Sequence, residues 1–400
     1  MEGNRSECAD FTTSRPDPTN EGWVIAVFSV VYLHIFVLGL IGNTAVIYLT
    51  FKHRHLQTVQ NMFILNLALS DVIVCLLSMP FTLVTNIYKA WYFGSPFCHL
   101  LPMVQGVSIF VSTFSLSAIA LDRYNLVVRP HAHPLNVRGA CLVAAVLWIV
   151  SVIVCLPYGW YMRIQTYPGF CGEYCSESWP SQDVRLGYAL LVLTTQFLLP
   201  FATMAVCYYT IFSVLKERAA VKLKKLSERS QLLENSTALA HEQSVDTGDY
   251  VPAAEGQQRL TVVMQQRRTT MILASMVLLF GGTWLPYNLF TMLVDYGEGF
   301  FYYGETNYEY FVSTITHSFA MITIVANPFL YAWLNPSFKE ILMKTLRGRS
   351  HADLKYHTSI SRTPTVAKKP VTKVSSKASC PSVGYSEVYQ NSTPATPGSP

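Results

Sequence analysis

The chain has 400 residues, of which 51% are hydrophobic and only 13% are charged. Soluble globular proteins usually carry about a quarter charged residues, so this composition argues against an ordinary soluble protein. The polar residues gather at the two ends and around residues 216–268, and long stretches between them carry no charge. This distribution is typical of a membrane protein with polar tails.

Seven segments are long and apolar enough to be transmembrane helices, which need roughly 20 apolar residues each. Helices satisfy their own backbone hydrogen bonds in lipid, so each segment is predicted to be helical. In chain order the segments are 24–51, 61–88, 97–128, 139–161, 184–215, 269–294 and 310–334. The predicted fold class is an all-α membrane protein built as a seven-transmembrane helix bundle.

Basic residues predict the orientation of this bundle. They are concentrated in the connections after the first, third and fifth segments and in the chain that follows the seventh. Because basic connections stay in the cytoplasm, we expect an extracellular N-terminus and a multi-pass protein of the plasma membrane. Residues 1–22 lack the apolar core of a cleavable signal peptide, so the first helix is expected to direct insertion.

The predicted organisation has three parts. An extracellular tail (1–23) precedes a seven-transmembrane domain (24–347), and a disordered cytoplasmic tail (348–400) follows it. The domain contains a long cytoplasmic loop (216–268), whose polar middle, about 230–256, is expected to be disordered. The basic ends of this loop are expected to extend the fifth and sixth helices and to suit an acidic protein partner or anionic membrane lipid.

The extracellular face is acidic, with twelve Asp and Glu residues against five Lys and Arg residues. Translocated loops avoid Lys and Arg for topological reasons alone, which explains the few bases. It does not explain the many acids. The charge therefore favours a cationic ligand.

Four of the nine cysteines lie outside the cell, where disulfides persist. Four cysteines allow three connectivities. Cys98 is at the outer end of the third segment, and we prefer Cys175 of the second outer loop as its partner. Cys8 with Cys171 would complete the set. Asn4 begins a glycosylation sequon in the exposed N-terminal tail.

Polar residues recur at mid-depth in four of the segments: Asn43, Asp71, Ser112 and Asn327. They can line a hydrated cavity in which Asp71, Ser112 and Asn327 hold a monovalent cation such as sodium. Alternatively, they form a hydrogen-bond network that only fixes helix packing. We favour the ion site because an isolated carboxylate is costly in the membrane.

Prolines interrupt the last three segments at Pro200, Pro286 and Pro328, and each is expected to bend its helix. Trp284 stands just before one of these bends, where a bulky ring can couple an outer pocket to the inner face. Asp122, Arg123 and Tyr124 end the third segment on the cytoplasmic side. The Arg can stay paired with Asp122 or release its guanidinium to a partner.

Together these residues resemble the rhodopsin-like family of G-protein-coupled receptors, over roughly residues 24–347. The motifs that carry the resemblance are Asn43, Leu67-Ala68-Leu69-Ser70-Asp71, Cys98, Asp122-Arg123-Tyr124, Trp148, Pro200, Tyr208, Phe280 with Trp284-Leu285-Pro286, and Asn327-Pro328-Phe329-Leu330-Tyr331. The resemblance implies that Asp122, Arg123, Tyr124, Tyr208, Asn327, Pro328 and Tyr331 serve activation and G-protein coupling. It also implies a short amphipathic helix at Phe338.

Within that family, the chain is similar to receptors for neuropeptide Y and neuropeptide F. The residues that carry this likeness are Gln105, Asp295, His317, Trp91-Tyr92-Phe93-Gly94 and Cys175-Ser176-Glu177-Ser178-Trp179-Pro180. The Asp-Arg-Tyr-Asn-Leu-Val-Val-Arg-Pro run and the second loop cysteine resemble those of invertebrate members, of the nematode type. Receptors for biogenic amines carry an Asp where this chain has Gln105, and opsins carry a Lys in the seventh segment, which residues 308–334 lack.

The resemblance implies a ligand that ends in Arg, an aromatic residue and an amide. Asp295 would pair with the ligand Arg, Gln105 would bind near the amide, and His317 would line the pocket. Trp284, Tyr287 and Asn288 complete the expected ligand-binding set. Alternatively, neither residue contacts a ligand: Asp295 is an acid exposed to water at the extracellular rim, and His317 is an interior histidine with all its hydrogen bonds made. We favour the ligand roles because buried polar groups cluster at binding sites.

The function that follows is a neuropeptide receptor coupled to a heterotrimeric G protein of the inhibitory class, and not an enzyme. Arrestin and receptor kinases are expected at the tail, with membrane lipid as a further partner and no nucleic acid or cofactor. A tachykinin-like or RYamide-like peptide is the alternative ligand. A transporter or channel is the remote alternative, because the chain has no internal repeat and no paired broken helices. The tail cysteine Cys380 is not assigned a palmitoyl anchor.

Overall fold

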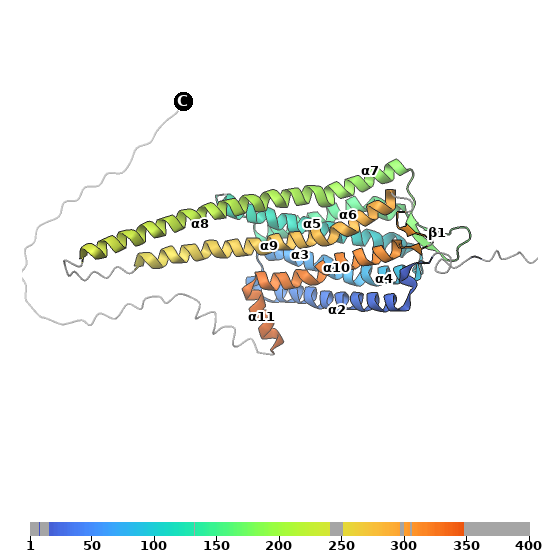
Figure 1. The fold of residues 1–400 in the computed structure, drawn as a ribbon, viewed down its shortest axis with the longest axis horizontal. Helices are drawn as coiled ribbons and strands as arrows, with labels where there is room; N and C mark the ends of the chain where they lie inside the picture. Colours follow the sequence, from blue (N-terminus) through green and yellow to red (C-terminus); the bar gives the residue numbers. More distant parts are fainter. Residues whose placement is uncertain are drawn as a thin grey trace, which may run out of the picture. The chain divides into compact units, whose positions relative to one another are not determined.

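The computed structural model describes Cys8 and residues 16–131, 133–240, 251–296, 300–304 and 306–347. These belong to one unit, Met1–Gly348, and residues 349–400 form a second unit, which lies outside the described residues. Seven helices in the described part are long and apolar enough to cross a membrane, which confirms the predicted bundle. Figure 1 shows them side by side, with the strands at one end.

The helices follow the predicted segments closely. In chain order they are α2 (Gly22–Lys52), α3 (Val59–Ile73) continued by η3 (Val74–Ser78) and α4 (Met79–Tyr88), α5 (Gly94–Val128), α6 (Val137–Tyr161), α7 (Gln182–Leu193) continued by η4 (Thr194–Leu198) and α8 (Leu199–Ala240), α9 (Val251–Tyr296), and α10 (Glu309–Leu334). Two single turns, η1 (Pro18–Asn20) and η2 (Arg54–Leu56), precede α2 and α3.

Two of these helices extend much further than predicted, as Figure 1 shows for α8 and α9. The expected disorder of residues 230–256 is wrong where the structure describes them, because 230–240 and 251–256 are helical. The described parts of this segment consist largely of Ala, Leu, Glu and Gln, which are good helix formers. Residues 241–250 lie outside the described part.

Two spans contain a π-helical turn, η3 in the second and η4 in the fifth. Each turn is followed within two residues by a proline, Pro80 or Pro200. A proline cannot donate a backbone hydrogen bond, and a wide turn before it is one way for a helix to absorb the defect. The sequence predicts the bend at Pro200, but not the type of turn.

The expected amphipathic helix after the seventh span is α11 (Pro336–Leu346). Asn335 begins it by accepting a hydrogen bond from the Phe338 backbone N–H at 3.1 Å. Phe338 and Ile341 are buried, and the ring of Phe338 lies 4.5 Å from that of Tyr331. Figure 1 shows α11 turning away from the axis of α10.

The extracellular loops form two small hairpins. Strands β1 (Met162–Gln165) and β2 (Tyr174–Glu177) pair antiparallel, as do β3 (Tyr302–Tyr303) and β4 (Thr306–Asn307). Both predicted disulfides are formed. Cys98 of α5 is bonded to Cys175 of β2, and Cys8 to Cys171 just before that strand.

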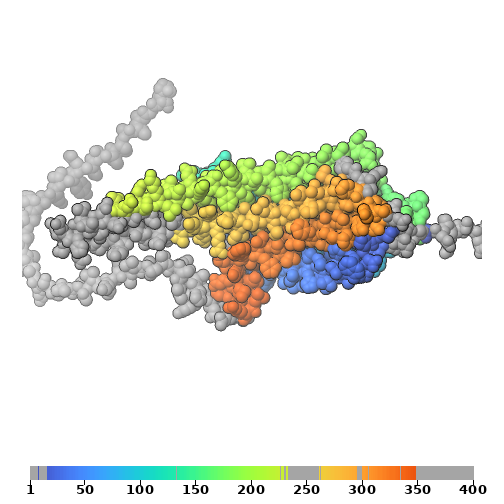
Figure 2. Space-filling view, in the orientation of Figure 1, coloured from blue at the N-terminus to red at the C-terminus, as the bar shows by residue number. Residues whose placement is uncertain are grey.

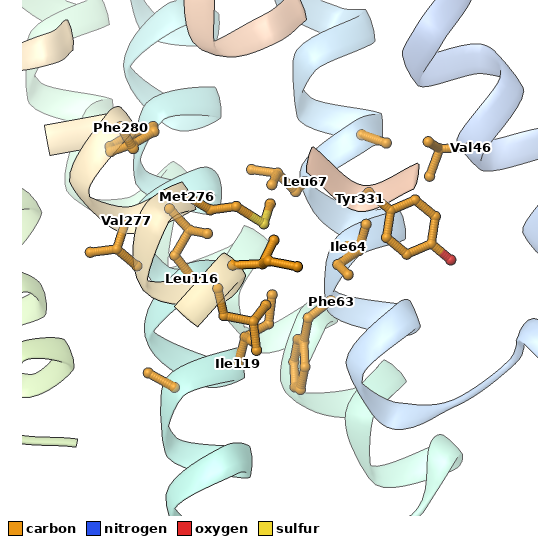
Figure 3. Packing of buried hydrophobic residues seen from close by; sticks show 14 of the residues in the cluster. Val46, Phe63, Ile64, Leu67, Leu116, Ile119, Met276, Val277, Phe280 and Tyr331 are labelled. Carbon is orange, nitrogen blue, oxygen red and sulfur yellow. The ribbon is translucent and has the colours of Figure 1, made fainter. Parts of the chain in front are cut away.

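The apolar core lies toward the middle and cytoplasmic half of the bundle. Figure 3 shows Phe63, Leu116 and Met276 converging from α3, α5 and α9, and Tyr331 joins them from α10. The extracellular half contains a set of polar side chains.

Candidate functional site

The extracellular half of the bundle brings together a polar pair that the sequence predicted as ligand-binding. Nε2 of Gln105 on α5 lies 3.4 Å from Nε2 of His317 on α10. His317 is buried, whereas Gln105 is partly exposed. Two residues 212 positions apart thus meet at one point between helices.

Aromatic rings surround this pair. The ring of Tyr287 lies edge-on to His317 at 5.5 Å and to Trp284 at 6.0 Å. Phe280 continues the row 6.0 Å below Trp284, toward the core. The three α9 rings and His317 therefore form a continuous path from the polar pair to the apolar core.

Two neighbours of the polar pair were not predicted. The Tyr32 hydroxyl on α2 lies 2.7 Å from Nδ1 of His317, and the two rings stack at 5.8 Å. Ser78, in the π-turn η3, donates to Oε1 of Gln105 at 2.6 Å. Gln105 therefore directs its NH₂ group, and not its carbonyl, toward His317. A hydroxyl in an apolar helix is common, so neither residue could be singled out from its type.

Trp284 has a buried indole N–H without a hydrogen-bond partner among the described residues. A buried donor of this kind carries a desolvation cost of about 1–3 kcal/mol, which an acceptor from a ligand or water can offset. Asn288, one turn above, instead donates to the Trp284 carbonyl at 2.7 Å. One of its two side-chain N–H donors is thus used, and the other donor and the carbonyl oxygen remain for other contacts.

Asp295 lies in the last turn of α9, which ends at Tyr296 at the extracellular rim. Its side chain lies outside the described part of the chain, so its predicted pairing with a ligand Arg stays a prediction. On the facing loop, the Glu177 carboxylate accepts from Trp179 Nε1 at 2.6 Å and lies 3.4 Å from Nε of Arg185.

The N-terminal segment is fixed to the top of the bundle by a buried ion pair. Nζ of Lys89, at the end of α4, lies 3.6 Å from Oδ1 of Asp17, and both side chains are at most 1% exposed. Lys89 also donates to Oδ1 of Asn20 and lies 5.3 Å from the centre of the Tyr310 ring. Burial lowers the pKa of Lys89, although the Asp17 carboxylate raises it. Neither residue was singled out from the sequence beyond its charge.

The expected cation site is partly assembled. Nδ2 of Asn327 donates to Oδ2 of Asp71 at 3.0 Å, and Ser112 lies 2.8 Å from the Ser70 hydroxyl. Asn43 donates instead to the backbone oxygens of Gly39 and Ile324, both at 2.9 Å. The contact of Asn327 with Asp71 suits both interpretations, an ion site and a packing network, so the sodium site stays a prediction.

The cytoplasmic end carries the expected charge pair in its paired form. Nη2 of Arg123 lies 3.5 Å from Oδ2 of Asp122, and neither Nε of Arg123 nor Oδ2 of Asp122 makes a hydrogen bond within the described residues. Tyr124 receives the guanidinium of Arg129 over its ring at 5.6 Å.

The other residues expected to serve activation are packed inside the bundle. Tyr208 on α8 and Tyr331 on α10 are buried. Pro328 packs so closely on α2 that a Cβ at Gly42 would lie 2.9 Å from its Cγ. The coupling roles of all these residues stay predictions. Asn4, Cys380 and the tail lie outside the described residues.

The chain matches the model of the seven-transmembrane receptor (rhodopsin) family over residues 42–331. It is 47% identical to neuropeptide receptor npr-1 of Caenorhabditis elegans, over 86% of this chain and 78% of that receptor. The neuropeptide F receptor of Drosophila melanogaster is 30% identical over 78% of this chain and 60% of its own length. The human neuropeptide Y receptor type 2 is 28% identical over 85% and 81%.

These matches cover the helices that hold both the outer polar cluster and the inner charge pair, and they decide against a transporter, a channel or an enzyme. The chain therefore belongs to the rhodopsin family of seven-transmembrane, G-protein-coupled receptors, as a multi-pass membrane protein of the neuropeptide Y and neuropeptide F receptor type.

Proposed function

We propose that this receptor binds a neuropeptide ending in Arg, an aromatic residue and an amide, and that it signals through a heterotrimeric G protein of the inhibitory class. The observation that carries the ligand proposal is the polar cluster of Gln105, His317 and Tyr32. It lies beneath an extracellular rim on which acids outnumber bases.

The chemistry of the cluster suits the amidated end of a peptide. A terminal carboxamide offers both donors and an acceptor, and Gln105 and His317 offer both kinds of group within 3.4 Å of each other. The rings of Tyr287 and Trp284 provide apolar faces for an aromatic side chain. An Arg one residue before it would point back toward the rim, where Asp295 lies at the end of α9.

The names of the similar proteins support the same ligand class, because they are receptors for neuropeptides, neuropeptide F or neuropeptide Y. For signalling, we propose that a bound ligand displaces Trp284, and that α9 then moves relative to α8 and α10. This shift would release Arg123 from Asp122 for contact with the G protein. The inhibitory class rests on the resemblance alone, and loss of the response after pertussis toxin would test it.

The ligand role of Asp295 has a direct test. Membranes that contain the receptor are assayed for guanine-nucleotide exchange evoked by a synthetic peptide ending in Arg-Phe-amide, and by the same peptide with citrulline for Arg. Asp295→Ala should weaken the Arg peptide about 10- to 100-fold, since a charge-assisted hydrogen bond contributes about 1.5–3 kcal/mol. It should weaken the citrulline peptide far less.

Asp183→Ala is the matched control, because Asp183 is an exposed acid on the same face, in the first turn of α7. Its Arg-peptide potency should stay within about twofold of the unchanged receptor. Equal potency of the Arg peptide on Asp295→Ala and Asp183→Ala would reject the pairing. Failure of all Arg-aromatic-amide peptides, with response to a tachykinin-like peptide, would instead reject the ligand class.

A further inference from the structure

A groove lies between α9 and α10 on the outer surface of the bundle, near its cytoplasmic end. Its volume is about 300 Å³, and its walls include Met264, Met271, Ile272 and Trp333. Figure 2 shows α9, in yellow to orange, beside the darker orange α10 on the visible face. The groove is distant from the proposed peptide site, because it is formed by the opposite ends of these two helices.

The walls of this groove are apolar and face outward. Met271 is 53% exposed and Trp333 is 61% exposed, and both lie within spans that cross the membrane. Positions 264, 268, 271 and 275 recur at helical spacing, so they line one face of α9. Since lipid surrounds this face, a hydrocarbon chain is the natural occupant of an outward-facing apolar groove.

Two arginines stand at the cytoplasmic rim of the groove. Arg267 and Arg268 lie one turn before Met271, and both belong to the groove lining. Both are exposed, and neither has an ion-pair partner among the residues that the structure describes. The lining contains no acidic residue. The cytoplasmic leaflet is anionic, and a guanidinium binds phosphate through paired hydrogen bonds.

We propose that this groove is a binding site for an anionic phospholipid of the cytoplasmic leaflet. Arg267 and Arg268 bind the headgroup phosphate, and one acyl chain runs along the groove between Met271 and Trp333. An acidic protein surface would also suit the two arginines, but it would leave the apolar groove in the lipid unfilled. The lipid site goes beyond peptide reception and does not depend on the identity of the peptide.

The charge requirement is tested on the purified full-length receptor by native mass spectrometry, with phosphatidylserine or phosphatidylcholine added. One phosphatidylserine should stay bound under conditions that remove phosphatidylcholine. Arg267→Gln with Arg268→Gln should weaken that binding at least about tenfold. Lys224→Gln with Lys225→Gln is the matched control, since it removes two exposed basic residues from α8, outside the groove, and it should change this binding less than twofold.

The apolar groove is tested separately by filling it. Ser275 belongs to the lining and is exposed, so Ser275→Phe occupies the groove while both arginines remain. It should lower retention of phosphatidylserine about as much as the double arginine variant. Leu278→Phe adds a ring at a position that is 74% exposed and outside the lining, and it should have no such effect.

A photoactivatable phosphatidylserine locates the bound lipid directly on the unchanged receptor. In nanodiscs of the unchanged receptor, its acyl-chain label should be recovered on residues 264–275 or 330–333. Labelling only elsewhere would overturn the proposal, as would unchanged retention in the double arginine variant. If that variant kept the lipid but lost nucleotide exchange, the arginines would bind an acidic protein surface instead.

Discussion

In the outer polar cluster, the orientation of the Gln105 amide decides which of its groups would face the proposed ligand. Gln105 can present either its NH₂ or its carbonyl to His317, and the two choices recognise opposite partners. Ser78 settles the choice because its hydroxyl donates to Oε1 of Gln105 at 2.6 Å. The Ser78 hydroxyl is therefore a positioning group for a predicted ligand contact.

Ser78→Ala should lower peptide potency about three- to tenfold, because it removes one hydrogen bond worth about 1 kcal/mol and frees the amide to turn. Ser151→Ala is the control, since Ser151 is equally buried but donates only to the Leu147 carbonyl within α6. Both variants should be measured by dose–response of nucleotide exchange. Equal potency of the two would show that Ser78 has no role in orienting Gln105.

The family resemblance predicted part of this site. Gln105 and His317 stand out because amide and imidazole groups are unusual in apolar helices, and a family resemblance gave them a role. Ser78 has no such signal, since serine hydroxyls are tolerated in apolar helices by bonding to the helix backbone. Tyr32 has none either, because a tyrosine presents a large apolar ring together with its hydroxyl. Their function depends on contacts across 285 and 27 residues, which only the folded bundle provides.

One glycine allows α8 and α9 to approach each other closely. A Cβ at Gly281 would lie 2.5 Å from Cε1 of Phe201, so the phenyl ring would have to leave its stacked position on Phe197. Gly282, the next residue, has no atom within 4 Å of its Cβ position. The pair Gly281-Gly282 therefore contains one residue that must be small and one that need not be.

Gly281→Ala should destabilise the receptor by about 1–3 kcal/mol, the usual cost of an inserted methyl in a packed interface. Gly282→Ala should leave stability unchanged or raise it by up to about 1 kcal/mol, because alanine is the better helix former. Thermal melting of the purified receptor measures both. Adding Phe201→Leu should restore much of the loss in Gly281→Ala, and an equal melting temperature for the two alanine variants would contradict the contact.

The helices themselves were predictable because apolar length is decisive in a membrane, where each span must bond its own backbone. The sequence could also place a bend at Pro200. It could not distinguish a simple kink from the π-turn η4, since that choice depends on how neighbouring helices pack. Nor could polarity locate the ends of α8 and α9, because a charged helix outside the membrane has the same composition as a disordered loop.

The extracellular surface is held together by two disulfides and an ion pair that join segments distant in the sequence. One disulfide joins Cys8 of the N-terminal tail to Cys171, just before β2, over a sequence separation of 163 residues. The other joins Cys98 of α5 to Cys175 of β2, over a separation of 77 residues. The ion pair of Asp17 with Lys89 adds a third tie. This pair neutralises one acid and one base, so the excess of extracellular acids that favours a cationic ligand is unchanged.

Removing one partner of the buried pair of Asp17 and Lys89 should reduce stability far more than removing one partner of an exposed pair. Burial lowers the pKa of Lys89 even with Asp17 beside it, so the desolvation of the ammonium outweighs its attraction to the carboxylate. Asp17→Asn leaves this ammonium buried without its counter-charge and should cost about 3–5 kcal/mol. Adding Lys89→Met removes the ammonium as well and should recover most of that loss, because an apolar replacement for a buried pair is often neutral or stabilising.

The melting temperatures of the single and double variants measure this recovery. The pair of Lys344 with Glu340 on α11 is the control, since its nitrogen and oxygen are 2.7 Å apart but the side chains are 24% and 60% exposed. Glu340→Gln should change stability by less than about 1 kcal/mol, because water screens an exposed pair. If Asp17→Asn were as mild as Glu340→Gln, the N-terminal segment would not be fixed by its charge, and the disulfide at Cys8 would be its main tie to the bundle.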